Sequence, residues 1–179
     1  MKVLLEPFDG VKVLEPTRFA DSRGFFLESF HQGNYGALGI QEAFVQDNHS
    51  RSVRNVLRGL HFTRKKAQSQ ILTVIRGRIF DVVVDLRRGS PSSGKWFGAE
   101  LSDEGPRQIY MAHGFAHGFC VLSEIADLHY KVSQFYDPAD EGGLRWDDPT
   151  VAIKWPVSAP IISPRDLAHP RLDESLVTG

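Results

Sequence analysis

Hydrophobic and polar residues alternate with a period of two along many short stretches of the chain, a pattern that predicts β-strands. The clearest stretch runs from Arg78 to Arg87. Its apolar residues share one face, which carries Phe80, Val82, Val84 and Leu86. The opposite face is charged and carries Asp81, Asp85 and Arg87. Because an apolar face is stabilised by leaving water, we expect that face of the strand to lie in the core.

Other stretches have the composition of strands and are bounded by Gly, Pro, Asp or Asn. The run Ile71–Ile75 ends at Arg76-Gly77-Arg78, so we expect it to form a hairpin with the next strand, turning at Gly77. Further strands are predicted at Val11–Glu15, Gly24–Phe30, Phe44–Ser50, Val56–Phe62, Gln108–Met111, Ala116–Leu122, Ala126–Gln134 and Val151–Trp155.

Helical periodicity is weak. It predicts only a short helix at Gln32–Leu38 and another after Pro164. The chain of 179 residues has no repeat and no linker, so we expect a single domain over residues 1–179. Many short strands with a buried inner face favour an all-β jelly roll with short peripheral helices.

Composition narrows the classes of function. Hydrophobic residues make up 41% and charged residues 24%, an ordinary globular balance, and the formal net charge of −1 gives no broad surface for nucleic acid. No stretch has the length of a membrane span or the pattern of a secretory signal, so we expect a cytoplasmic protein without membrane contact. The lone Cys120 lies in an apolar run, which indicates a small buried hydrophobe.

Several residues could carry chemistry, but each has an ordinary structural interpretation as well. His61 has the alternation parity of a strand's interior face, where a histidine bonded to a backbone carbonyl is the commoner case. Strict alternation sends Arg58 to the opposite face, unless Gly59 marks a bulge or bend. Tyr130 shares a face with apolar neighbours and fits a core tyrosine.

A metal site has little support from the sequence. His113 and His117 are four residues apart, but glycines interrupt the segment, so the helical spacing that binds metal is not available. Metal-binding cupins usually carry a His-x-His pair, and the chain has none. A metal-dependent oxygenase is therefore disfavoured.

Taken together, six segments resemble the dTDP-4-dehydrorhamnose 3,5-epimerase family, in the family's order and over nearly the whole chain. The segments are Asp21–Ser29, Phe44–Ser50, Val56–Phe62, Phe80–Arg87, Gly114–Phe119 and Ser163–Asp166. The resemblance implies a cupin-type jelly-roll barrel, a homodimer, a nucleotide-sugar substrate, and neither a metal nor an organic cofactor.

The resemblance also implies an isomerase with three catalytic residues. His61 would remove a proton, Asp166 would orient and polarise His61, and Tyr130 would reprotonate the opposite face of the sugar. A ketone at C4 acidifies the hydrogens on C3 and C5, so one base can serve both carbons. The expected reaction converts dTDP-4-dehydro-6-deoxy-glucose into dTDP-4-dehydro-L-rhamnose, the precursor of L-rhamnose.

Substrate contacts carry over by position in the same way. Arginines suit a pyrophosphate because their planar donors contact two oxygens at once, and Tyr136 matches the aromatic residue that stacks on the nucleotide base. The other residues that match family contacts are Arg23, Glu28, Gln46, Asp47, Asn48, Arg58, His117, Glu141 and Arg165.

The chain departs from the family pattern at positions that bear on the substrate. Gln70 stands where the family usually has a lysine, and Thr63 replaces a glutamine. His113 or Lys131 would be the residues to compensate for the missing cation. The alternatives left open are epimerisation at C3 or C5 only, another nucleotide-linked 4-ketosugar, or a sugar-binding jelly roll without catalysis.

Overall fold

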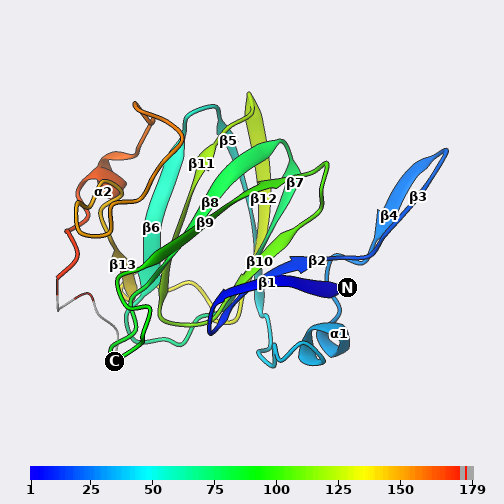
Figure 1. Ribbon diagram of the computed structural model, residues 1–179, viewed down its shortest axis with the longest axis horizontal. Helices are drawn as coiled ribbons and strands as arrows, with labels where there is room; N and C mark the ends of the chain where they lie inside the picture. The colour runs from blue at the N-terminus through cyan, green and yellow to red at the C-terminus, as the bar shows by residue number, and fades with distance from the viewer. Residues whose placement is uncertain (174–175, 177–179) are drawn as a thin grey trace.

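The computed structural model describes residues 1–173 and residue 176, and it consists mainly of antiparallel strands (Figure 1). The strands of the barrel are β1 (Lys2–Phe8), β2 (Val11–Glu15), β5 (Gln46–Val53), β6 (Leu57–Thr63), β7 (Gln70–Arg76), β8 (Arg78–Asp85), β9 (Trp96–Ser102), β10 (Gln108–Met111), β11 (Phe115–Val121), β12 (Ile125–Val132) and β13 (Glu141–Gly143). Strands β3 (Arg18–Asp21) and β4 (Gly24–Leu27) form a separate hairpin.

Two sheets form the barrel. One has the strand order β1-β2-β10-β7-β12-β5 and the other has the order β13-β6-β11-β8-β9. Their facing sides enclose an apolar core to which both sheets contribute, including Leu72 and Leu128 from one and Val83 and Val121 from the other. The predicted all-β, cupin-type jelly roll is confirmed.

Strand β8 is buried on both faces, which goes beyond the prediction of a single core face. Val82 and Val84, on the apolar face, pack outside the barrel in a second cluster with Leu144 and Val151 from the C-terminal part of the chain. The opposite face turns toward the barrel interior, where Val83 joins the main core. A covering segment thus hides the outer side of this sheet, and Asp81 lies fully buried on the inner side.

The predicted hairpin at Gly77 is wrong. The chain does turn there, with φ of +82° at Gly77, but β7 and β8 belong to different sheets. A Cβ at Gly77 would lie 2.1 Å from the carbonyl oxygen of Ile125, so the corner between the sheets needs a glycine.

The remaining strand predictions hold with shifted ends, except one. Val151–Trp155 forms no strand, because its apolar side chains instead pack against the outer face of β8. The short helices are present as α1 (Gln32–Gly36) and α2 (Pro164–Leu167). Cys120 is buried, as expected. In the part of the chain that the structure describes, no helix is long and apolar enough to cross a membrane.

The β3–β4 hairpin extends away from the barrel (Figure 1). Three of its aromatic side chains are open to solvent: Phe19 is 62% exposed, Phe25 55% and Phe26 70%. An isolated two-stranded hairpin buries little apolar surface of its own. This hairpin therefore presents an apolar surface to whatever lies next to the monomer.

Candidate active site

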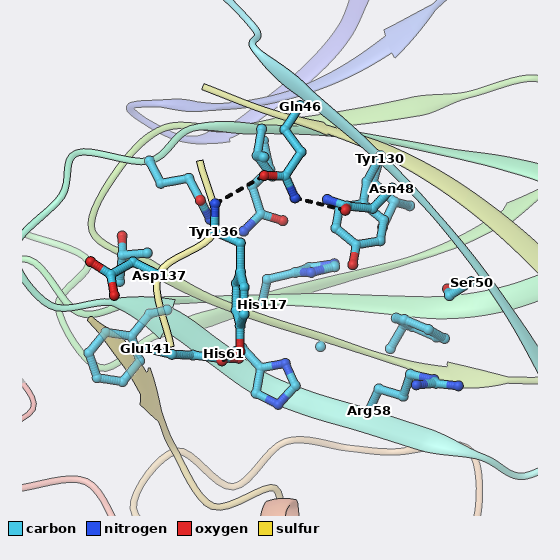
Figure 2. A pocket seen from close by; sticks show the side chains of 18 of the residues that line it. Gln46, Asn48, Ser50, Arg58, His61, His117, Tyr130, Tyr136, Asp137 and Glu141 are labelled. Atoms are coloured by element: carbon cyan, nitrogen blue, oxygen red, sulfur yellow. Dashed lines mark hydrogen bonds between the residues drawn. The ribbon is translucent and has the colours of Figure 1, made fainter. Parts of the chain in front are cut away.

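A pocket of about 370 Å³ is lined by residues of both sheets (Figure 2). Its walls carry most of the residues that the sequence indicated. The lining includes Gln46, Asn48, Arg58, His61, His117, Tyr130, Tyr136, Glu141 and Arg165. Residues from β5, β6, β11, β12 and the segment after β12 therefore meet at one site.

His61, on β6, is held by a carboxylate from α2. Its Nε2 donates to Oδ1 of Asp166 over 2.9 Å, and the backbone N–H of Gly59 donates to Oδ2 of the same residue over 3.1 Å. Burial raises the pKa of Asp166, but these two donors outweigh it and hold the pKa at about 2. The carboxylate is thus ionised, Nε2 of His61 carries the proton, and Nδ1 is left to accept another.

Gly59 explains why Arg58 and His61 line the same pocket. It has φ of +112°, and the pairing of β6 with β11 shifts register between His117 and Phe119. A Cβ at Gly59 would lie 2.6 Å from the carbonyl oxygen of His117. The bend that the sequence left open is therefore present, and strict alternation fails at this point.

Tyr130 approaches the pocket from the other sheet. It lies on β12, whereas His61 lies on β6, so the two side chains come from opposite walls (Figure 2). Burial raises the pKa of Tyr130, and the charge of Arg58 offsets part of that rise. The phenol is protonated at neutral pH and can donate a proton.

A chain of hydrogen bonds joins the residues at the pocket rim. Gln46 donates from Nε2 to Asn48 and accepts from the backbone N–H of Tyr136, and the Tyr136 hydroxyl donates to Glu141 over 3.0 Å. Arg165 pairs with the second oxygen of Glu141 at 2.5 Å. These contacts hold the rim residues to one another, while Tyr136 is 58% exposed.

His117 lies beside His61 on the neighbouring strand, because the two residues are paired across β11 and β6. Its Nε2 lies 2.8 Å from Oδ2 of Asp81, whose side chain is fully buried. The other oxygen of Asp81 is buried without a hydrogen-bond partner. A buried carboxylate thus fixes the orientation of the His117 ring in the pocket wall.

Three predicted contacts lie outside this pocket. Asp47 sits between Gln46 and Asn48 on β5 and points the opposite way, where Lys131 donates to it over 2.6 Å. Arg23 occupies the turn of the projecting hairpin and pairs with Asp21. Glu28 follows the same hairpin and accepts from Asn34.

The two departures from the family pattern do line the pocket: Gln70 begins β7 and Thr63 ends β6. The residues considered as replacements for the missing lysine do not. Lys131 is bound to Asp47 and lies over the Phe30 ring, and His113 is not among the lining residues. Arg58 and Arg165 are the arginines of the lining.

Sequence reasoning missed Ser50 and Gln68, which also line the pocket. Alternation could have predicted Ser50, since it lies two residues after Asn48 and four after Gln46 on the same face of β5. Gln68 follows no such rule, because it lies in the loop before β7.

The fold and the pocket together define the class of cupin-type sugar epimerases. Residues 6–174 match the sequence profile of the dTDP-4-dehydrorhamnose 3,5-epimerase family. The chain belongs to this family.

Individual relatives cover almost the whole chain. It is 46% identical to the dTDP-4-dehydrorhamnose 3,5-epimerase of Salmonella typhimurium, over 99% of both chains. It is 48% identical to the Escherichia coli protein of the same name, over 97% of this chain and 96% of that one. Among solved structures it resembles the 3,5-epimerase of Legionella pneumophila in complex with dTDP-4-keto-L-rhamnose, with a TM-score of 0.94 and 43% identity over 99% of this chain and 97% of that one.

Proposed function

We propose that the protein is an isomerase that inverts C3 and C5 of dTDP-4-dehydro-6-deoxy-glucose to give dTDP-4-dehydro-L-rhamnose. The observation that carries this proposal is that His61 and Tyr130 approach one pocket from opposite sheets. Inversion requires removal of a proton from one face of the carbon and return of a proton to the other face. Family membership supports the same reaction.

In this mechanism Nδ1 of His61 removes the proton next to the C4 ketone. Asp166 stays ionised throughout and stabilises the imidazolium that forms, since its oxygen already accepts from Nε2. The electron pair moves onto the C4 oxygen as an enolate, and Tyr130 then protonates the carbon from the opposite face. A positioned base or acid typically contributes about 10²–10⁴-fold to the rate.

The remaining lining residues suit the nucleotide part of the substrate. Arg58 and Arg165 are the cations that would contact the pyrophosphate, and the exposed ring of Tyr136 would stack on the base. Gln46, Asn48, His117 and Glu141 supply hydrogen-bonding groups along the same walls.

We further propose a homodimer, in which a second copy brings Arg23 and Glu28 to this pocket. Both residues match family substrate contacts, yet both lie on or beside the hairpin that extends away from their own barrel (Figure 1). The exposed Phe19, Phe25 and Phe26 give that hairpin an apolar surface suited to a partner. Light scattering should give twice the mass of one chain, and a monomer at working concentration would contradict this arrangement.

Asp47 remains a proposed contact, although its carboxylate must leave Lys131 to reach a ligand. We place the reaction in the cytoplasm, carried out by one domain over residues 1–179 and without a cofactor.

Deuterium incorporation tests the reaction directly. Incubation with dTDP-4-dehydro-6-deoxy-glucose in deuterated water should place label at both C3 and C5, and NMR should identify the L-rhamno product. Label at one carbon only would identify a single-site epimerase. Label at neither carbon, with binding retained, would indicate a sugar-binding protein without catalysis.

A further inference from the structure

His169 has no role in the mechanism above, yet its side chain lies beside both His61 and Asp166. Its Nε2 is 3.5 Å from Oδ1 of Asp166, the same oxygen that accepts from His61, and the two imidazole rings meet edge to face with centroids 5.5 Å apart. Nε2 of His169 is buried and makes no hydrogen bond. A buried imidazole nitrogen without a hydrogen bond is uncommon and requires an explanation.

The three side chains have the composition and spacing of a transition-metal site. Their ligand atoms, one nitrogen from each histidine and one carboxylate oxygen, all lie within 4.8 Å of one another. Zinc binds such atoms at about 2.0–2.2 Å in tetrahedral geometry, which separates neighbouring ligand atoms by about 3.3 Å. The distances from Asp166 Oδ1 to the two histidines, 2.9 and 3.5 Å, lie on either side of that value.

The chemistry of the three side chains also suits a cation. Imidazole nitrogens and carboxylate oxygens are ligands of divalent transition metals. The positive charge of nearby Arg165 is balanced by Glu141, 2.5 Å away.

Packing fixes the position of the His169 ring. A Cβ on Gly143 would lie 2.2 Å from that ring, so the ring rests directly against the backbone of β13. Only 12% of the His169 side chain is exposed, whereas His61 is 35% exposed and lines the pocket. An ion would therefore enter from the pocket, whose water would supply the fourth ligand.

We propose that His61, Asp166 and His169 form a binding site for Zn²⁺ or a similar divalent transition metal, and that an ion bound there inhibits the enzyme. The inhibition, though not the binding, rests on the function proposed above. Binding replaces the His61–Asp166 hydrogen bond with bonds from both residues to the ion.

Inhibition follows from the two nitrogens of His61. An ion bound at Nε2 requires the tautomer that carries its proton on Nδ1. That nitrogen already holds a proton and cannot take one from the sugar, so the base is blocked without any change in the rest of the pocket.

Metal binding is measured first, without substrate. The metal-free full-length protein is titrated with Zn²⁺ against a chromogenic chelator, and with Co²⁺ for the visible absorption of a tetrahedral ion. We expect one ion per chain and an affinity that falls by at least about tenfold in His169→Gln, since even indirect ligand contacts contribute that much. His129→Gln is the matched control, because His129 lies near the exposed Asp47 on another strand.

Equal zinc affinity in the wild type and His169→Gln would overturn the proposal, as would the absence of a one-to-one complex. His169→Asn serves as a second variant if the glutamine variant has a lower melting temperature. These outcomes do not depend on turnover.

Turnover is then measured with and without Zn²⁺. We expect the ion to inhibit the wild type reversibly, with recovery on addition of EDTA, and to leave His169→Gln active at the same concentration. If the protein binds zinc but shows no turnover in the absence of metal, the proposed metal site stands and the proposed function is contradicted. Equal inhibition of both proteins would contradict the inhibitory role of the site.

Discussion

The carboxylate of Asp166 lies 2.9 Å from Nε2 of His61, although 105 positions separate the two residues along the chain. Its second oxygen accepts from the backbone N–H of Gly59. One side chain thus fixes both the tautomer of the proposed base and the bend in the strand that carries it.

Asp166→Asn should lower kcat by about 10²-fold or more, because general base catalysis contributes on that order. Asparagine has one acceptor oxygen where aspartate has two, so it cannot serve Gly59 and His61 together. Its neutral amide also fails to stabilise the imidazolium. Steady-state kinetics on a folded variant tests this, with Asp147→Asn on the surface as control; an unchanged kcat would remove Asp166 from the mechanism.

Tyr130→Phe should separate the two proton transfers. His61 remains able to remove the proton, so solvent deuterium should still exchange into the sugar. Inverted product should form about 10²-fold more slowly, because the acid that protonates the opposite face is missing. NMR in deuterated water records exchange and inversion in one sample. If exchange and inversion fall equally, Tyr130 does not act as the separate acid.

Gly59→Ala should destabilise the fold by at least about 3 kcal/mol, since both strain and overpacking apply. Its Cβ would meet two backbone atoms of β11 at 2.6 and 2.8 Å, and φ of +112° disfavours any L side chain. Denaturant unfolding measures the loss. Gly105→Ala, where nothing lies within 4 Å of the added Cβ, is the matched control and should change stability little.

Gln70→Lys should raise kcat/KM about tenfold. Gln70 is neutral and lines the same pocket as His61 and Tyr130, and a charged donor forms hydrogen bonds roughly twice as strong as a neutral one. Gln70→Met removes the hydrogen-bonding group but keeps a side chain of similar volume, and this variant should have a lower kcat/KM. A lysine variant no better than the wild type would show that Arg58 and Arg165 already supply the charge.

Acid stability should depend on Asp85. Burial raises the pKa of this carboxyl, but Arg87, Ser90 and Ser92 outweigh it and lower the pKa from 3.8 to about 2. The ionised form is therefore favoured in the folded state, so the stabilisation is complete above about pH 4 and is lost as the pH falls toward 2.

Asp85→Asn should thus reduce the free energy of unfolding at pH 7 by about 2 kcal/mol and flatten its decrease between pH 4 and pH 2. Denaturant unfolding across that pH range measures both effects. Glu124→Gln, on an exposed loop, should have neither. A parallel decrease in wild type and Asp85→Asn would contradict the assignment.

The period-two pattern predicted most strands and the class of fold, because a half-buried strand shows its periodicity in any tertiary setting. It could not predict which strands pair. Gly77 has the sequence of a hairpin turn, yet the chain passes from one sheet to the other there. The charged face of β8 has the pattern of a solvated surface, yet Asp81 and Asp85 are buried.

Site residues were predicted through the family resemblance more than through periodicity. His61 considered alone fits a structural histidine. Alternation left the face of Arg58 dependent on a bend at Gly59, and the sequence could not decide whether that bend forms. No local pattern in the sequence indicates that His169, three positions after Asp166, lies next to His61 on β6. Such contacts depend on how the C-terminal segment docks.

That docking has a consequence for the order of events during synthesis. The strands from β1 to β13 leave the ribosome first, and Asp166 follows with the segment that covers the outer face of β8. A nascent chain that has formed its barrel still lacks the partner of His61. The proposed base therefore acquires the carboxylate that orients it only when the segment after β13 packs against the barrel, which ties the onset of activity to the docking of that segment.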